Sequence, residues 1–446
     1  MIPPAHTPLR TDAGPLDVDY GTILNCIHCG LCLPSCPTFQ LTGAEKHSPR
    51  GRIQMMRAVA DDRLPIEGDF TDSLDFCLGC YACETACPAG VDYSVLFEAS
   101  REAIERDKNR RGVANRFANF VLRRVFTSNK RLKALARSLR LARRSGLQGL
   151  GVRSGLLKKL APKLAALEPM APAISRKFAD QLIRPVERPK GAVKVRVGLL
   201  KGCVMNVAFA DVQRQTADLL LACGAEVHFP DAPCCGALHG HQGDLDTARD
   251  LARRVLTAFE ACGELDALVV NAAGCGAFLK EYGHLLSGDP DWAARAARFA
   301  AKVRDVSEFL LEVERPAPKY DVPVRATYHD ACHLAHAQGV TAAPRALLAE
   351  VPGLDLVPLP DSTTCCGSAG LYNVLQPEAA SALLARKMDA IRSTGATLVL
   401  TGNPGCALQI AAGARQFLTE PDGLGPPVEV AHPVTILHRA WLGPAA

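Results

Sequence analysis

The chain has 446 residues, of which 48% are hydrophobic, enough to build the cores of two to four domains. Its net charge is +5, but residues 101–190 carry a net +18 and the rest of the chain a net −13, so one strongly basic segment stands in an acidic protein. The eighteen cysteines occur in metal-ligand spacings, which argues against a disulfide-stapled secreted protein and for a reducing, cytoplasmic compartment.

Residues 1–20 contain no apolar core, so we expect a flexible lead-in and not a signal peptide. The longest uncharged stretch, residues 393–414, is interrupted by Gly402-Asn-Pro-Gly405. It therefore predicts a strand, a turn and a helix, and we expect no membrane-spanning helix.

Two cysteine motifs with the spacing C-x-x-C-x-x-C-x-x-x-C-P dominate the first hundred residues, starting at Cys26 and Cys77. This spacing is typical of [4Fe–4S] clusters, in which the first three thiols of a motif hold one cluster and the fourth ligates the other. A zinc site is the alternative, but zinc usually takes two C-x-x-C pairs set well apart. The predicted ligands are Cys26, Cys29, Cys32 and Cys87 for the first cluster, and Cys77, Cys80, Cys83 and Cys36 for the second.

The segment between these motifs predicts a helix, because Ser48 precedes Pro49 at the first helical position. Arg50 and Arg52 lie in its first turn. They are candidates to donate hydrogen bonds toward a cluster and raise its potential, and the alternative is a solvated first turn. An amphipathic helix over residues 93–107 is expected to close a two-cluster ferredoxin domain spanning residues 1–108.

Residues 109–190 contain no cysteine and are expected to form a basic amphipathic helical connector. Leucines repeat with a helical period from Leu122 to Leu139 and again over Leu156, Leu157, Leu160, Leu164 and Leu167, with arginines and lysines on the other faces. Such helices bind anionic membrane surfaces or acidic partner subunits, and the alternative is a solvated connector. No recognition motif or aromatic interleaving indicates nucleic-acid binding.

From residue 193 onward strands and helices alternate, and the pattern is repeated. Strands are expected at 194–200, 226–229 and 267–270, and again at 324–328, 354–359 and 397–400. Cys235 and Cys366 are each followed by another key cysteine 40 residues later, and the repeats are offset by 131 residues at these positions. This internal duplication predicts two Rossmann-like α/β domains with parallel sheets, at 191–318 and 319–446. The expected fold is thus a multidomain α+β and α/β protein.

The key cysteines of this duplicated region all fall a few residues past the end of a predicted strand, and most have a glycine nearby. Because open parallel sheets place their sites at the carboxyl ends of the strands, these thiols are expected to converge at one rim per domain. Gly236 and Gly367 leave room for a sulfur-rich ligand. We expect at least one further metal centre, either as two sites or as one shared site, and the alternative is a set of buried packing thiols. The candidate ligands are Cys203, Cys234, Cys235 and Cys275, and Cys332, Cys365, Cys366 and Cys406.

Together these motifs resemble the iron–sulfur subunits of glycolate oxidase (glycolate dehydrogenase), over nearly the whole chain. The Cys-Cys-Gly domains are also similar to heterodisulfide reductase catalytic subunits, whose motifs end in C-x-x-C and build a noncubane cluster. Here Phe278 and Gln409 stand where the last cysteine of each motif would be. The strings that carry the resemblance are Cys26-Ile-His-Cys-Gly-Leu-Cys, Pro49-Arg-Gly-Arg-Ile53, Gly274-Cys-Gly-Ala-Phe-Leu-Lys-Glu-Tyr-Gly283, His336-Ala-Gln338 and Cys365-Cys-Gly-Ser-Ala-Gly-Leu-Tyr372.

The resemblance implies a division of labour. A separate FAD-binding oxidase subunit oxidises glycolate to glyoxylate, and the iron–sulfur subunit passes the electrons toward a quinone-type acceptor. It also implies a cytoplasmic protein, peripheral on the inner face of the cell membrane. No catalytic residue is expected in this chain. The alternatives are a disulfide or quinone reductase acting at the Cys-Cys-Gly rim, and the equivalent subunit of a lactate or glycerol-3-phosphate dehydrogenase.

Overall fold

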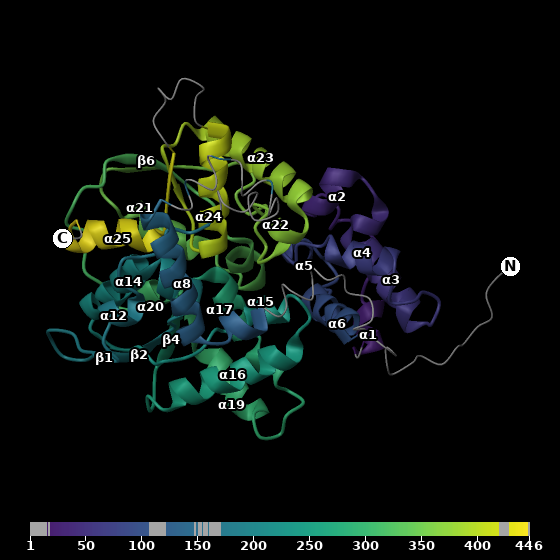
Figure 1. Ribbon diagram of the computed structural model, residues 1–446, viewed down its shortest axis with the longest axis horizontal. Coiled ribbons are helices and arrows are strands. Elements are labelled where there is room, and N and C mark those ends of the chain that lie inside the picture. Colours follow the sequence, from purple (N-terminus) through teal and green to yellow (C-terminus); the bar gives the residue numbers. More distant parts are fainter. Residues whose placement is uncertain are drawn as a thin grey trace.

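The computed structural model describes residues 16, 18–106, 122–146, 149, 154, 159, 171–418 and 428–444. It is a mixed α/β structure with a helical N-terminal part and two parallel sheets (Figure 1). The N-terminal helices lie on one side of the molecule, and both sheets with their covering helices lie on the other. Among the described residues, no helix combines the length and apolarity needed to cross a membrane.

The N-terminal part is built from short helices around two cysteine loops. Met56, Phe70 and Leu74 are fully buried in its core. The helix expected after Ser48 is confirmed, since the Ser48 hydroxyl accepts a hydrogen bond from the Gly51 N–H at 3.0 Å and caps it. The helices are α1 (Tyr20–Leu24), α2 (Pro37–Thr42), η2 (Glu45–His47), α3 (Pro49–Ala60), α4 (Asp69–Asp75), α5 (Ala82–Thr85) and α6 (Tyr93–Arg106).

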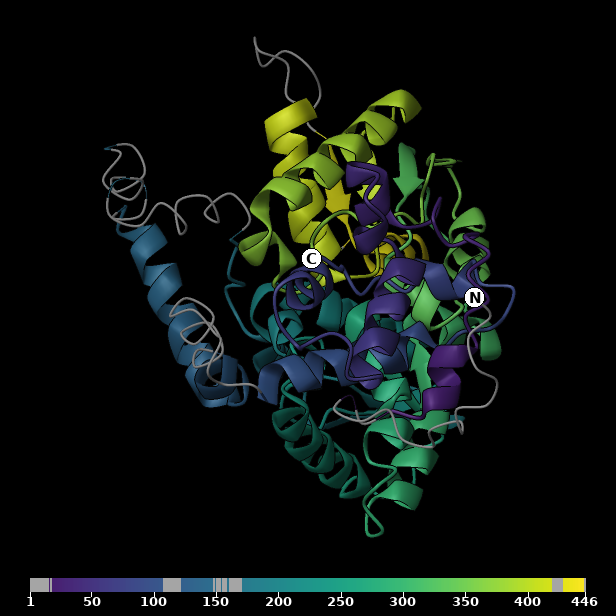
Figure 2. The same ribbon diagram turned by 90° about the vertical axis from the view of Figure 1, so that its right-hand side faces the viewer.

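The basic segment contributes the short π-helix η4 (Leu122–Phe126) and the helix α8 (Asn129–Arg144). Figure 2 shows α8 along the outside of the molecule. Leu132 and Ala136 are buried against the first sheet domain. The second leucine repeat, at 156–167, lies outside the described residues.

The first sheet has the order β1-β3-β2-β4-β5, and all its pairs are parallel except β1 with β3. Its strands are β1 (Val186–Glu187), β2 (Val195–Leu199), β3 (Ala225–His228), β4 (Ala267–Val270) and β5 (Val303–Asp305). Its helices are α12 (Ala179–Leu182), α13 (Val204–Ala208), α14 (Ala210–Ala222), α15 (Ala237–Gly240), α16 (Leu245–Glu260), α17 (Ala273–Lys280), α18 (Tyr282–Leu285), α19 (Ala293–Lys302) and α20 (Val306–Glu312).

The second sheet, of order β7-β6-β8-β9, is parallel throughout. Its strands are β6 (Val324–Tyr328), β7 (Leu354–Val357), β8 (Leu398–Leu400) and β9 (Glu429–Ala431). Its helical segments are η6 (His333–Ala337), α21 (Ala342–Ala349), α22 (Tyr372–Leu375), α23 (Pro377–Thr394), α24 (Pro404–Gly413), η7 (Ala414–Leu418) and α25 (Pro433–Leu442).

The six strands predicted from the duplication are confirmed to within two residues at each end. In both sheets the first of them lies between the other two, as β3-β2-β4 and β7-β6-β8. The three cysteine-bearing turns of each repeat therefore emerge side by side at one edge. The C-terminal helix α25 packs on α14 of the first domain, with Trp441 buried in a core that both domains share.

Candidate metal centres

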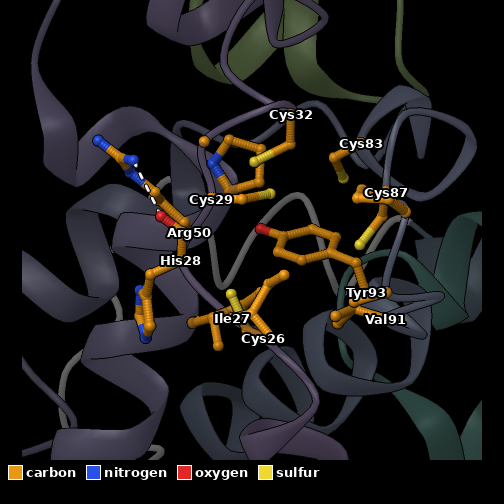
Figure 3. Close-up of a pocket in the computed structure, with 15 residues that line it drawn as sticks. Cys26, Ile27, His28, Cys29, Cys32, Arg50, Cys83, Cys87, Val91 and Tyr93 are labelled. Atoms are coloured by element: carbon orange, nitrogen blue, oxygen red, sulfur yellow. Dashed lines mark hydrogen bonds between the residues drawn. The ribbon is translucent and has the colours of Figure 1, made fainter.

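Four thiols from the two ferredoxin-type motifs surround one cavity. Cys26, Cys29 and Cys32 come from the first motif and Cys87 comes from the end of the second. Figure 3 shows their sulfur atoms around the same space, which Cys83 also borders. The structure thus brings together the four residues expected around the first cluster. Their ligation of a cluster stays a prediction.

A second cavity is lined by Cys77, Cys80 and Cys83 from the second motif and by Cys36 from the end of the first. The two motifs therefore exchange their fourth cysteines. Tyr93 borders both cavities, and its hydroxyl lies 3.6 Å from the Cys77 sulfur. The ring of Tyr93 and the side chain of Cys83 thus line both cavities.

The electrostatics of the second cavity suit a bound cation. Burial, and next the neighbouring Cys332, raise the pKa of Cys80 well above its usual range. Burial and then Cys80 do the same to the pKa of Cys83. Without a cation these thiols stay protonated, whereas a soft metal binds them as thiolates and displaces their protons. Convergent, buried thiols fit an iron–sulfur cluster, which supplies one-electron transfer when bound.

Arg50 and Arg52, the two candidates to donate hydrogen bonds toward a cluster, have different surroundings. Arg50 pairs with Glu45 at 2.6 Å near the surface and donates to the His28 carbonyl at 3.2 Å. Arg52 is only 1% exposed, and its Nη1 lies 3.9 Å from the sulfur of Cys36. Its position excludes a solvated side chain. Although burial favours its neutral form, the neighbouring Cys77 thiol contributes to raising the pKa of Arg52 above its usual value.

In the first sheet domain the four cysteines lie in a row at the sheet edge. The sulfurs of Cys203 and Cys234 are 3.7 Å apart. Cys234 then contacts Cys235, and Cys235 contacts Cys275. The hydrogen bond to Cys234, together with burial, raises the pKa of Cys203 well above its usual range.

The second sheet domain repeats this row of thiols. Cys332 contacts Cys365, Cys365 contacts Cys366, and Cys366 contacts Cys406. The hydrogen bond to Cys365, together with burial, raises the pKa of Cys332. The sequence thus predicted which residues come together in each domain. It left open whether they bind metal, and that remains a prediction.

The second row of thiols faces the ferredoxin-type part. Cys80 and Cys332 both pack against one buried apolar cluster, which includes Leu78 and Cys365. Next to it, the ring of His333 hydrogen-bonds to the Gly79 carbonyl at 2.8 Å and stacks on Tyr81 at 5.5 Å. The loop that lines the second cavity therefore sits directly on the cysteine edge of the second domain. Residue spacing within the motifs contains no signal for this contact.

Two buried polar residues beside these thiols were not predicted. One donor atom each of His329, Cys366 and Cys406 lies within 4.8 Å of the others. Lys387 is 3% exposed, and its Nζ donates to the Asp361 carbonyl at 2.6 Å. His329 lies three residues before the first cysteine of its repeat, where the first repeat has Leu200. This difference between the repeats is the signal by which the sequence could have indicated His329.

The positions that depart from the C-x-x-C pattern are both occupied by buried side chains. Phe278 is 1% exposed and packs against the ring of His241. Gln409 is 2% exposed and accepts a hydrogen bond from Asn373 at 3.0 Å. Both side chains therefore have packing or polar partners of their own, and neither supplies a thiol.

Comparison with family models identifies three kinds of segment. The 4Fe-4S dicluster domain matches residues 22–91, and the cysteine-rich domain matches residues 197–280 and 326–411. The linker region of the glycolate oxidase iron–sulfur subunit matches residues 114–171.

Curated relatives cover nearly the full chain. The probable glycolate oxidase iron–sulfur subunit of Bacillus subtilis is 39% identical over 428 residues, 95% of this chain and 95% of the relative. The glycolate oxidase iron–sulfur subunit of Escherichia coli is 32% identical over 91% of this chain and 94% of the relative. Lactate utilization protein A of Geobacillus kaustophilus is 33% identical over 55% of this chain and 99% of the relative.

Proposed function

The chain belongs to the family of glycolate oxidase iron–sulfur subunits, and on this premise we propose that it carries electrons from a flavoprotein to a quinone. Glycolate loses two electrons and two protons as it becomes glyoxylate, and the FAD of a partner subunit takes up both electrons. This chain passes them on singly, and a quinone that gains two electrons and two protons becomes a quinol. Iron–sulfur clusters suit this step because they exchange one electron at a time.

The observation that carries the proposal is the continuity of the thiol sites. Cys83 and Tyr93 border both ferredoxin-type cavities, and Cys80 of the second cavity shares a buried cluster with Cys332 and Cys365. Three sites therefore adjoin one another in series. We assign the clusters to the crossed ligand sets, Cys26, Cys29, Cys32 and Cys87, and Cys77, Cys80, Cys83 and Cys36.

The finer architecture belongs to the same proposal. Residues 1–108 form the two-cluster domain, 109–190 a basic connector, and 191–318 and 319–446 two Rossmann-like domains. In the connector, the exposed residues of α8 include Leu135, Leu139 and several basic side chains. We propose that this face contacts an anionic membrane surface or an acidic face of the flavoprotein, at the cytoplasmic side of the membrane.

The alternative of a disulfide reductase at the Cys-Cys-Gly edge is less well supported. Cys365 and Cys366 are 3% and 1% exposed, and the ferredoxin-type loop covers this edge. A substrate disulfide would have to displace that loop to reach a thiol. The lactate-related alternative has some support from relatives named lactate utilization protein A, but they match only about half of the chain.

The test is reconstitution with the flavoprotein subunit. The flavoprotein alone is expected to become reduced by glycolate, and a quinone analogue to be reduced only after this chain is added. Lactate and glycerol 3-phosphate serve as competing substrates. Equal quinone reduction with and without this chain would contradict the proposal, and reduction driven only by lactate or glycerol 3-phosphate would reassign the substrate.

A further inference from the structure

Three possible metal ligands converge at the edge of the second sheet. One donor atom each of His329, Cys366 and Cys406 lies within 4.8 Å of the other two, and all three residues are buried. His329 is 0% exposed, and neither of its ring nitrogens makes a hydrogen bond of normal geometry within the described residues, although the backbone of Ser362 lies close to the ring. A fully buried imidazole without a partner is unfavourable unless another group, such as a metal, binds it.

The sheet itself sets this convergence. His329 follows β6 directly, and its N–H donates to the Leu400 carbonyl at the end of β8 at 2.9 Å. Cys406 lies in the first turn of α24, which follows β8, and Cys366 lies beyond the end of β7. Because β7, β6 and β8 are adjacent and parallel, the three side chains meet at one rim.

The first domain lacks the nitrogen ligand. Its equivalent of His329 is Leu200, whose N–H makes the matching hydrogen bond to the Val269 carbonyl of β4 at 3.1 Å. The thiols are duplicated between the repeats, whereas the imidazole is present only in the second. Duplication alone therefore does not account for His329.

Lys387 differs between the repeats in the same way. The helices α23 and α16 occupy equivalent places in the two repeats. Gly367 packs directly against Ala380 of α23, and Gly236 packs in the same way against Ala248 of α16. Lys387 then corresponds to the fully buried Val255. Lys387 lies close to the thiols of Cys366 and Cys365. The second site thus differs from the first in having His329 and Lys387 where the first has the apolar residues Leu200 and Val255.

We propose that His329 is a nitrogen ligand of an iron centre in the second cysteine-rich domain, together with thiolates from Cys366, Cys406 and the adjoining Cys332 and Cys365. The assignment of iron rests on the proposed function, because Cys80 of the second ferredoxin-type cavity lies beside Cys332 and Cys365. A neutral imidazole in place of an anionic thiolate raises the potential of an iron–sulfur centre. This centre then accepts electrons from the ferredoxin-type clusters.

Pulsed EPR on the whole chain, purified anaerobically, tests the ligand directly. A reduced sample should show a third signal, beyond those of the two ferredoxin-type clusters, with hyperfine coupling to a histidine nitrogen. Labelling histidine with ¹⁵N should change that coupling in the ratio of the nuclear g values. The iron content should exceed the roughly eight atoms of two [4Fe–4S] clusters.

The decisive variant is His329→Leu, which introduces the residue that the first repeat carries at this position. It is expected to remove the nitrogen coupling and either shift or abolish the third signal, while both ferredoxin-type signals stay. The matched control is His239→Leu, because His239 is also 0% exposed with neither ring nitrogen hydrogen-bonded. The control should keep the nitrogen coupling.

The proposal is overturned if the iron content does not exceed about eight atoms, if zinc alone occupies the site, or if the coupling survives in His329→Leu. Quinone reduction by the reconstituted complex is measured separately. A complex that reduces quinone with only two clusters would overturn this inference and leave the proposed function intact. A nitrogen-coupled third centre in a chain that transfers no electrons to quinone would support the ligand assignment and contradict the function.

Discussion

Replacing Arg52 by glutamine is expected to lower the reduction potential of the cluster in the second cavity by about 100 mV. The guanidinium donates to the Ser73 carbonyl at 2.9 Å and to the Thr38 hydroxyl at 3.1 Å, and its Nη1 is 3.9 Å from the Cys36 sulfur. Because arginine is always charged and Arg52 is buried, its positive charge attracts an electron added to the cluster, and water does not screen that attraction.

The magnitude follows from Coulomb's law. A unit charge about 6 Å from the added electron, at an effective dielectric constant of about 20, contributes about 2.8 kcal/mol. For a one-electron couple about 1.4 kcal/mol corresponds to 59 mV, so the full effect is about 120 mV. Water that enters the space left by the guanidinium restores part of this stabilisation, which gives the expected shift of about 100 mV.

Arg50→Gln is the matched control. The Arg50 side chain is 31% exposed and already paired with Glu45, so its removal should shift the potential of the first cluster by at most about 30 mV. EPR-monitored redox titration resolves both clusters in each variant. A shift below about 30 mV in Arg52→Gln with both clusters retained would refute the electrostatic argument. Arg52→Lys, which keeps the charge, should recover most of the potential.

Three further predictions follow from the described contacts. Cys87→Ser should remove the EPR signal of the first cluster, which the first three cysteines of the Cys26 motif also hold. Cys36→Ser should remove the signal of the second cluster. If each variant instead removes the signal of the cluster held by its own motif, the crossed ligation is contradicted. Changing the exposed Arg124 and Arg144 to Glu should weaken association with the flavoprotein or with anionic vesicles, as added salt should, whereas unchanged association under both treatments would leave the segment a connector. Burial raises the pKa of Glu98 from 4.5 to about 7, so the folded chain holds a proton that the unfolded chain releases, and stability should fall by about 1 kcal/mol from pH 6 to pH 8. In thermal unfolding, Glu98→Gln should remove that component of the pH dependence, and an unchanged slope would show that Glu98 ionises normally.

Much of this architecture could be predicted from the sequence, because the informative patterns are local. Cysteine spacing predicted both crossed thiol sets, and the strand boundaries at Ala267–Val270 and Val324–Tyr328 agree with the structure residue for residue. The strands that were missed, β1, β5 and β9, are two or three residues long. Segments that short carry too few side chains for an alternation to be recognised.

The contacts between distant segments could not be predicted. The two cavities can be inferred from motif spacing, but the docking of Cys80 against Cys332, 252 positions later in the chain, depends on surface complementarity that has no periodic signal. The burial of Arg52 has the same origin. Its neighbours Ser73 and Thr38 come from segments on either side of α3, and only the assembled core brings them together.

The docking geometry also bears on which of the two duplicated sites takes part in electron transfer. The ferredoxin-type part touches the first domain through α6, where the Arg101 carbonyl lies so close to Gly243 that no Cβ atom would fit on Gly243. It touches the second domain through the cluster loop itself. Buried thiolates need a nearby cation, and the buried Lys387 lies beside the second row of thiols, whereas the buried Lys201 of the first domain pairs with Asp231 at 2.6 Å.

Without a metal, the thiols of the first domain remain protonated, because burial and mutual contact raise the pKa of Cys203 and its neighbours. Phe278 then fills the space where a further ligand would stand and packs on the same edge. The duplicated fold thus provides one row of thiols that packs on the cluster loop through Cys332 and Cys365, and a second row with no cysteine in that packing cluster. We therefore expect iron loss in Cys366→Ser to interrupt quinone reduction, whereas Cys235→Ser should act mainly on stability, and equal loss of electron transfer in both variants would contradict this assignment.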